Sequence, residues 1–347
     1  MTSRSPLHDA HVECGARFTD FGGWEMPVSY EGTLAEHKSV REAAGVFDVS
    51  HLGRFLLEGP GAASLIDSLL CNDLSRIEPG RAQYTMLLDE AGGIIDDIIV
   101  WWLEEERFLV LPNGANHARV LAEFTGHDRA NATDIRPQSA LLAIQGPTAP
   151  GIIEEVFGNT PRRFRTLASE DGTATMAGTG YTGERGGEIM VDVDSARSAW
   201  DALLRAGVTP CGLAARDTLR LEMGYPLWGQ DLDESTTPLE ADLEWVVGWD
   251  SNFRGKKALT RQRDQGFERQ LIGFRFDDRR VPRPGHPLRY GDGGGAVTSG
   301  NFSPVLQVGI GLGYLSPPPG DGAQPVEVEI RGEWHPATRV DPPFLER

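Results

Sequence analysis

The chain has 347 residues, of which 39% are hydrophobic and 24% are charged, a profile typical of a globular protein with two or three domains. Its formal net charge of −18 argues against non-specific nucleic-acid binding, which needs a basic surface. No apolar stretch approaches the length of a membrane span, and the start MTSRSPLHDAH lacks a signal-peptide core, so we expect a cytoplasmic protein without a membrane partner.

The first residues contain two histidines, His8 and His11, separated by three positions. No partner stands at the spacing of a zinc motif, so we expect surface positions for them rather than a metal site. The cysteines, Cys14, Cys71 and Cys211, are far apart and form no C-x-x-C pair. This pattern favours neither a zinc knuckle nor a disulfide framework, and the sequence predicts no metal.

The first half of the chain alternates between helical and strand patterns. Residues 32–45 predict a helix with Thr33 as its N-cap and Gly45 as its C-cap. Strand material broken by a polar turn follows, and then a second helix over 61–74, before the stop Pro79-Gly80. This alternation predicts an α+β module with a mixed or antiparallel sheet. Its further elements are strands at 82–88, 91–102, 107–113 and 139–146 and a helix at 117–127.

The second half repeats this mixture and then changes in character. Helical patterns occur near 152–158, 195–207 and 212–224, with a strand ending at 193. After Arg263 the composition turns to Gly- and Pro-rich strand fragments at regular spacing, which predicts a small β-barrel or sandwich. We expect the boundary of this last domain between residues 255 and 268.

The segment AGGIIDDIIVWW, residues 91–102, places two adjacent carboxylates inside an apolar run. Successive side chains of a strand point to opposite faces, so Asp96 and Asp97 are separated, and neither face is otherwise polar. Burying an ionised carboxylate without partners is costly, so at least one of the two must be hydrogen-bonded, paired or functional. From the pattern alone, a structural Asp and an active-site carboxylate both remain open.

Two further charged residues stand in apolar or Gly-rich surroundings, Glu188 in GGEIMV and Arg216 in GLAARDTLRLEMG. A solvent-facing strand residue and a helix-stabilising ion pair are the structural alternatives for them. The segment 178–183 matches G-x-G-x-x-G, but it runs into a strand pattern instead of opening a helix, so nucleotide binding is not favoured. The chain contains no G-x-S-x-G motif of a hydrolase.

Several long segments resemble the glycine cleavage system T-protein family, the tetrahydrofolate-dependent aminomethyltransferases. They occur in family order and are CGARFTDFGGWEMPVSY, HKSVREAAGVFDVSHLGR, AQYTMLLDEAGGIIDDIIV, GYTGERGGEI, CGLAARDTLRLEMGYPLWGQDLDESTTPLEADLEWVV and AVTSGNFSPVLQVGIGLGYL. The resemblance implies an α+β fold of three domains in a cloverleaf, with folate in a central channel. It implies a discontinuous first domain of residues 1–50 with 140–255, a second domain of 51–139 carrying the Asp96 strand, and a C-terminal β-barrel domain of 256–347.

The resemblance also assigns site residues. It implies that Asp96 faces the folate and is catalytic, which leaves Asp97 as a structural residue on the reverse face. It implies that substrate and folate contacts come from Tyr84, Asn113, Glu188, Arg216 and Trp228. We expect the Glu188 carboxylate to accept hydrogen bonds from the aminopyrimidine edge of the pterin.

The implied reaction transfers the methylene of an aminomethyl-lipoyl H-protein to tetrahydrofolate and releases ammonia. The partners would be tetrahydrofolate as substrate and the lipoylated H-protein. A folate-dependent demethylase of the same fold is the alternative. A non-enzymatic folate-binding protein of iron–sulfur maintenance is a second one, but the K-G-C-x-x-G-Q motif of those relatives is missing here.

Some positions depart from the family pattern. Arg185 replaces a small or acidic residue, Trp228 and Trp101 stand where Tyr is common, and the C-terminal PPFLER has no counterpart of a substrate-binding Tyr. Because H-proteins of this system are acidic, docking would need a local basic patch. The best candidates are Arg279, Arg280 and Arg283, with Arg289 nearby, although a solvated loop is the alternative.

Overall fold

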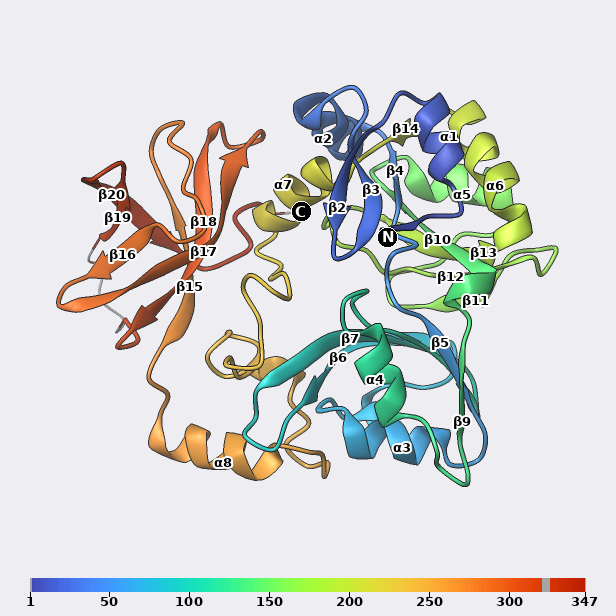
Figure 1. The fold of residues 1–347 in the computed structure, drawn as a ribbon, viewed down its shortest axis with the longest axis horizontal. Coiled ribbons are helices and arrows are strands. Elements are labelled where there is room, and N and C mark those ends of the chain that lie inside the picture. Colours follow the sequence, from blue (N-terminus) through green and yellow to red (C-terminus); the bar gives the residue numbers. More distant parts are fainter. Residues whose placement is uncertain (1, 320–324, 347) are drawn as a thin grey trace.

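The computed structural model describes residues 2–319 and 325–346, which form three lobes arranged around a common centre (Figure 1). The first lobe is built on a six-stranded mixed sheet in the order β11-β12-β13-β10-β4-β14. A three-stranded sheet, β1-β3-β2, lies beside it. The strands of the large sheet are β4 (Gly45–Asp48), β10 (Ser139–Gln145), β11 (Thr166–Ala168), β12 (Ala174–Ala177), β13 (Gly186–Asp192) and β14 (Thr209–Pro210). Those of the small sheet are β1 (Ser3–Arg4), β2 (Arg17–Phe21) and β3 (Trp24–Ser29).

The helices of the first lobe pack on these sheets because each has an apolar side to bury. Helix α6 shows this pattern, since Ala196, Ala199, Trp200 and Leu203 recur at intervals of three or four residues and are all buried. They join a core cluster with the β10 and β13 side chains. The helices are α1 (His8–Glu13), α2 (Thr33–Glu42), α5 (Ala149–Phe157), α6 (Val193–Arg205) and α7 (Leu213–Glu222).

The second lobe is an antiparallel five-stranded sheet in the order β6-β7-β8-β5-β9. Helices α3 (Ala62–Leu69) and α4 (His117–Glu123) cover one of its faces, and their apolar side chains share a core with β5, β7 and β8 (Figure 1). The other face looks toward the first lobe. The strands are β5 (Phe55–Glu58), β6 (Arg81–Leu88), β7 (Ile94–Glu104), β8 (Arg107–Leu111) and β9 (Asn131–Asp134), and short helical turns occur at η1 (Leu74–Arg76) and η2 (Arg136–Gln138).

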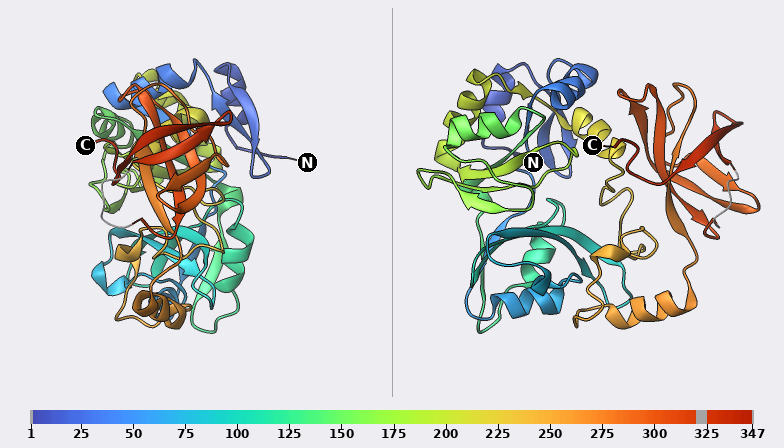
Figure 2. Two further views of the ribbon diagram at one scale, coloured as in Figure 1. Left: turned by 90° about the vertical axis from the view of Figure 1, so that its left-hand side faces the viewer. Right: turned by 180° about the vertical axis from the view of Figure 1, so that it is seen from behind.

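The third lobe is a closed six-stranded barrel, which confirms the predicted C-terminal β domain. Helix α8 (Lys256–Gln265) leads into the barrel, which forms one side of the molecule and lies beside α7 (Figure 2). Its strands, β15 (Gln270–Arg275), β16 (Pro287–Tyr290), β17 (Gly293–Ser303), β18 (Val308–Ser316), β19 (Val326–Ile330) and β20 (Glu333–Val340), are joined in the order β15-β18-β17-β16-β19-β20. The division into three domains remains a prediction, which this sheet membership supports.

Two buried charged residues of α7 are hydrogen-bonded to serines of the barrel. Glu222 accepts hydrogen bonds from Arg41 at 2.8 Å and from the Ser303 hydroxyl at 2.5 Å. Two residues earlier, Arg220 donates to Asp231 at 2.8 Å and to the Ser299 hydroxyl at 2.7 Å. Charged side chains buried in this way need such partners, so the two networks fix how α7 sits against the barrel strand β17.

Local details differ from the sequence predictions. Helix α2 begins at Thr33, and Gly32 with a φ of 123° occupies the capping position instead. The Glu36 carboxylate caps the start of the helix, because it accepts a hydrogen bond from the Gly32 N–H at 2.9 Å. Helix α2 ends at Glu42, and Gly45 starts β4, where a Cβ would lie 2.5 Å from the Val40 side chain. Helix α3 ends at Leu69, earlier than predicted, since Leu70 is extended and begins pairing toward β6.

The expected surface position of His11 is wrong. Its imidazole is fully buried, with Nε2 2.8 Å from an Asp48 carboxylate oxygen and Nδ1 3.0 Å from the Tyr30 hydroxyl. The Asp48 carboxylate also accepts a hydrogen bond from Ser5. These contacts anchor the N-terminal segment on β4, a tertiary role that the spacing of the histidines does not reveal.

None of the described helices is long and apolar enough to cross a membrane. In residues 2–319 and 325–346, no group of three or more His, Cys, Asp or Glu side chains is placed to hold a metal ion. The three cysteines are free. That the protein works without a metal stays a prediction.

Candidate active site

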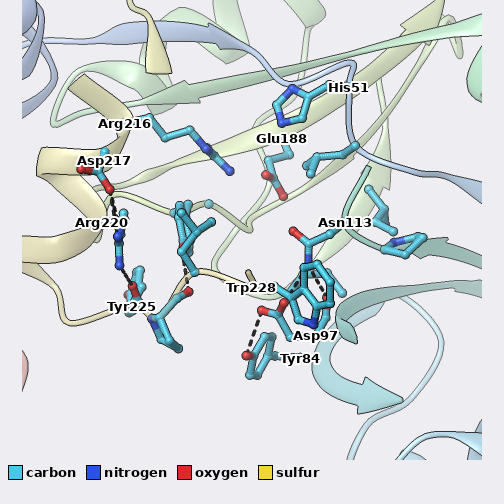
Figure 3. Close-up of a pocket in the computed structure, with 18 of the residues that line it drawn as sticks. His51, Tyr84, Asp97, Asn113, Glu188, Arg216, Asp217, Arg220, Tyr225 and Trp228 are labelled. Carbon is cyan, nitrogen blue, oxygen red and sulfur yellow. Dashed lines mark hydrogen bonds and ion pairs between the residues drawn. The ribbon is translucent and has the colours of Figure 1, made fainter. Parts of the chain in front are cut away.

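A cavity of about 390 Å³ lies where the first two lobes face each other, next to the segment that follows α7. This volume falls in the range of small-molecule sites. Apolar side chains form most of its wall, and a few polar groups converge into it (Figure 3). The strands β6, β7 and β13, the end of β8 and helix α7 all contribute residues, so segments far apart in the sequence meet here.

The carboxylate of Asp97 is the acidic group that the second lobe presents to the cavity. It accepts hydrogen bonds from the Tyr84 hydroxyl at 3.1 Å and from Asn113 Nδ2 at 2.7 Å (Figure 3). Burial raises the pKa of Asp97, and these two donors oppose the rise because they favour the charged form. The result is a carboxylate with fixed orientation at the edge of an apolar space.

Asp96 lies behind this wall, whereas the prediction placed Asp96 toward the cavity and Asp97 on the reverse side. It is fully buried and does not line the cavity. Its oxygens accept the backbone N–H of Asn113 at 2.9 Å, Asn113 Nδ2 at 2.9 Å and Asn116 Nδ2 at 2.6 Å. Burial, and then the nearby charge of Asp97, raise the pKa of Asp96 well above its usual range.

The alternation along β7 explains which carboxylate reaches the cavity. Asp97 shares its face with Ile99, which also lines the cavity, whereas Ile98 and Val100 pack into the core beneath α3 and α4. The strand begins with close contacts that only glycine permits, since a Cβ at Gly93 would lie 2.0 Å from the Glu234 carbonyl oxygen. The alternation of side chains along β7 was predicted correctly. Because both faces of the strand are mainly apolar, the sequence did not indicate which face meets the cavity.

Glu188 on β13 brings a second carboxylate to the cavity from the first lobe. It is 6% exposed and accepts a hydrogen bond from the Thr179 hydroxyl at 2.6 Å, which leaves further oxygen lone pairs for a ligand. The G-x-G-x-x-G segment passes beside it as a loop between two strands, as the strand pattern after it predicted. Gly180 of this loop packs so closely on Gln145 that a Cβ would lie 2.0 Å from its Oε1 atom.

Arg216 on α7 lies near Glu188 with its guanidinium 4.8 Å from the centre of the Tyr181 ring (Figure 3). Burial lowers its pKa, while the charge of Glu188 counters this. Its Nη1 atom is buried without a hydrogen-bond partner among the described residues, and the same holds for Nδ1 of His51. Both residues line the cavity.

Aromatic side chains complete the walls. Trp228 lines the cavity and donates its indole N–H to the Ile94 carbonyl oxygen at 3.2 Å. Trp245 stacks on Tyr84 with ring centres 6.0 Å apart, and it is 65% exposed, which is unusual for so large an apolar side chain. Such rings offer flat surfaces for a planar heterocycle.

The structure thus brings five of the six predicted substrate and catalytic residues to one cavity: Tyr84, Asn113, Glu188, Arg216 and Trp228. The sixth, Asp96, stands behind it. The predicted docking residues Arg279, Arg280 and Arg283 are exposed on the segment between β15 and β16 of the barrel and do not line the cavity. Arg185, which departs from the family pattern, is exposed and does not line it either.

Sequence reasoning missed several cavity residues: Asp97, His51, Tyr181 and Arg220. His51 stands in the segment HKSVREAAGVFDVSHLGR, which carries the family resemblance but does not single it out. Tyr181 stands inside the G-x-G-x-x-G match and inside the segment GYTGERGGEI, but neither pattern singles it out. These four residues come from a strand, two loop positions and a helix face, and the residues that lie across the cavity from them cannot be read from one chain segment.

Comparisons with known proteins match this chain along almost its whole length. The GCVT N-terminal domain model covers residues 7–251, and the glycine cleavage T-protein C-terminal barrel domain model covers residues 269–346. An aminomethyltransferase of Parafrankia sp. is 44% identical, with 99% of this chain and 97% of the relative aligned. One from Mycobacterium tuberculosis is 43% identical, with 98% and 96% aligned.

A solved structure agrees. The crystal structure of the glycine cleavage system aminomethyltransferase T from Bartonella henselae superimposes with a TM-score of 0.93 at 32% identity, covering 99% of this chain and 98% of that one. The fold, the two matched domain models and the full-length relatives therefore lead to one conclusion: the chain belongs to the glycine cleavage T-protein family of aminomethyltransferases.

Proposed function

We propose that this protein is a tetrahydrofolate-dependent aminomethyltransferase, which takes the methylene group of an aminomethyl-lipoyl H-protein onto tetrahydrofolate and releases ammonia. The observation that carries the proposal is the cavity with two separate carboxylates, Asp97 and Glu188, on opposite lobes. The Glu188 carboxylate suits recognition of a heterocycle, and the Asp97 carboxylate suits stabilisation of a cation that develops during the transfer. The cytoplasmic location expected from the sequence also remains a prediction.

The polar groups fit a folate in chemical terms. The aminopyrimidine edge of a pterin presents adjacent N–H donors, and the Glu188 carboxylate offers the matching acceptors. The flat ring would lie between aromatic walls such as Trp228 and Tyr84. The unpartnered Nη1 of Arg216 is a donor for a ligand oxygen. These contacts hold the substrate and orient its reacting nitrogen.

The chemical step asks for positioning and charge stabilisation rather than for a covalent enzyme intermediate. As the methylene passes to the folate nitrogen, positive charge develops on the iminium that forms. A preorganised carboxylate within a water-poor cavity stabilises such a charge more than water does. We assign this role to Asp97, because it faces the cavity, and we assign to Asp96 the task of holding Asn113, which in turn orients Asp97.

The decisive test is an assay with the aminomethyl-lipoyl H-protein and tetrahydrofolate, in which ammonia and 5,10-methylenetetrahydrofolate are both measured. We expect stoichiometric formation of the two products. If folate binds tightly but neither product forms, the proposed donor is wrong, and methylated O-, S- or N-compounds become the donors to test, as expected for a demethylase of this fold.

For the H-protein we propose a docking surface at Arg279, Arg280 and Arg283. All three side chains are exposed, and Arg280 is partly neutralised by Asp278 at 3.3 Å. Reversal of the three charges to Glu is expected to raise the KM for H-protein by about tenfold, because complementary charge speeds encounter and is screened by salt. Folate affinity should not change. Arg261→Glu on α8 is a matched control. An unchanged KM for H-protein in the triple variant would show that these three arginines are not part of the docking surface.

A further inference from the structure

The two ends of the cavity differ in their charges. At one end, the Asp97 carboxylate accepts hydrogen bonds from two neutral groups, the Tyr84 hydroxyl and the Asn113 amide, and no cationic side chain is paired with it in the described residues. At the other end, Glu188 lies near the guanidinium of Arg216. A carboxylate with neutral partners at the edge of an apolar space is complementary to a cation. The Asp97 end therefore has the charge that suits a cationic ligand.

Aromatic side chains line the cavity at the Asp97 end. Trp228 donates its indole N–H to the carbonyl oxygen of Ile94 at 3.2 Å, at the start of the strand that carries Asp97 (Figure 3). Tyr84, which donates to Asp97, stacks on Trp245 with ring centres 6.0 Å apart. The face of an aromatic ring carries partial negative charge, and sites that bind organic cations are lined by such rings.

The segment that carries Trp228 is held firmly against the strand. The N–H of Ile94 donates to the carbonyl oxygen of Thr236 at 2.9 Å, so both backbone groups of Ile94 are bound to this segment. The Asp231 carboxylate accepts the N–H of Leu227 at 2.9 Å and closes the turn. The indole packs against a buried apolar cluster and also lines the cavity. Its position beside the Asp97 strand is therefore fixed before a ligand binds.

No guanidinium of the described residues is found over the ring of Trp228. Other rings of the chain are covered in this way, as Tyr181 is by Arg216 at 4.8 Å and Trp249 by Arg263 at 3.9 Å. Among aromatic side chains, tryptophan attracts a cation most strongly. The attraction that the Trp228 ring can exert is thus not used by a cation of the described chain.

We propose that Trp228 is a further catalytic residue, whose indole face stabilises the iminium cation that forms on the stacked folate. This inference rests on the proposed function. A folate nitrogen bonds to the methylene carbon as ammonia leaves with the electron pair of its carbon–nitrogen bond, and the folate nitrogen gives up its proton. The carbon–sulfur bond then breaks with its electron pair on sulfur, which takes up that proton and leaves the methylene doubly bonded to a cationic nitrogen. Attack by the second folate nitrogen closes the product, and its proton passes to ammonia.

The contact acts on the rate because the charge is present only during the reaction. The pterin that binds is neutral, so it stacks on the indole as any flat ring does. Once the iminium forms, its positive charge lies within the stacked ring system, and the cation–π attraction is added. An interaction that is stronger in the transition state than in the bound substrate raises kcat instead of affinity.

The experiment replaces Trp228 by tryptophans with one, two and three ring fluorines, inserted at this position alone because the chain has eight tryptophans. Fluorine withdraws electrons from the ring face and weakens its attraction for a cation, while the indole keeps its shape and its N–H. With aminomethyl-lipoyl H-protein, we expect the single-turnover rate of 5,10-methylenetetrahydrofolate formation to fall stepwise, by about 3- to 30-fold over the series. The Kd of tetrahydrofolate, measured by calorimetry, should change much less than this rate.

The same fluorinated series at Trp102 is the matched control. Trp102 lies on the strand of Asp97, but it packs against the core beneath α3 and α4 and does not line the cavity. An unchanged rate across the Trp228 series would overturn the inference and leave the proposed function standing. A fall in rate matched by an equal loss of folate affinity would also overturn it, because Trp228 would then only stack on the neutral ring. Failure of the unsubstituted protein to form the products would instead contradict the proposed function itself.

Discussion

Replacement of Asp97 by Asn should lower kcat about 100- to 1,000-fold while the Kd of tetrahydrofolate changes little. The variant keeps the size of the side chain and one oxygen acceptor, but it removes the negative charge that faces the cavity. Loss of one preorganised group that stabilises charge in a transition state typically has an effect of this size. Single-turnover measurement of ammonia release, together with calorimetric folate binding, separates the chemical step from binding. Turnover within tenfold of the wild type would exclude Asp97 as the stabilising group.

The variant Asp96→Asn is the control for Asp97→Asn, because Asp96 is the adjacent carboxylate but does not line the cavity. It should unfold more easily, because the Asn113 and Asn116 amides that now donate to Asp96 would meet a side chain with a single acceptor oxygen. Its loss of kcat should be smaller than that of Asp97→Asn. The sequence-based assignment predicts the reverse order, so a greater loss in Asp96→Asn would restore Asp96 as the catalytic carboxylate.

The pH dependence of kcat also distinguishes Asp97 from Asp96 as the catalytic carboxylate. Burial raises the pKa of Asp97, so the acidic limb of kcat should lie above the normal range of a carboxyl group, and activity should be lost as pH falls through it. The charge of Asp97 raises the pKa of Asp96 further, so Asp96 is still protonated while Asp97 ionises, and the limb of Asp96→Asn should stay at the wild-type pH. Loss of the limb in Asp96→Asn would assign it to Asp96 instead.

Glu188→Gln should weaken tetrahydrofolate binding by about 10- to 100-fold, with a smaller effect on kcat at saturating folate. The change replaces an acceptor-only group with one that carries an NH₂ donor, which faces the N–H donors of the pterin edge. A hydrogen bond to a charged partner typically contributes about 1.5–3 kcal/mol, which corresponds to this range. The measurement is the Kd of tetrahydrofolate by calorimetry.

Thr179→Val provides a graded comparison for Glu188. It removes the hydroxyl that donates to the Glu188 carboxylate at 2.6 Å but leaves the carboxylate itself in place. We expect a several-fold weaker affinity, clearly less than in Glu188→Gln. Equal tetrahydrofolate affinities of the wild type and Glu188→Gln would show that the pterin edge does not bind at Glu188.

The sequence alone determined most of the framework of this protein. The Gly- and Pro-rich strand pattern after Arg263 predicted the barrel, since short alternating strands with frequent turns have few other stable arrangements. Periodicity likewise located β6, β7 and β8 and helices such as α6, because each buries one regular face. Long motifs in family order were sufficient to predict the family and five of the cavity residues.

Only the tertiary structure decided which side of each element meets the cavity. β7 is mainly apolar on both faces, so its alternation places Asp96 and Asp97 on opposite faces but does not indicate which of them meets the cavity. In the structure, helices α3 and α4 cover one face of the strand, and the other face lines the cavity. The buried position of His11 depends in the same way on Asp48, 37 residues further along the chain. Arg163 enters the cavity wall because a glycine 15 positions later, Gly178, lets the loop approach. Such contacts join distant segments, and a local pattern carries no information about what will lie across from it.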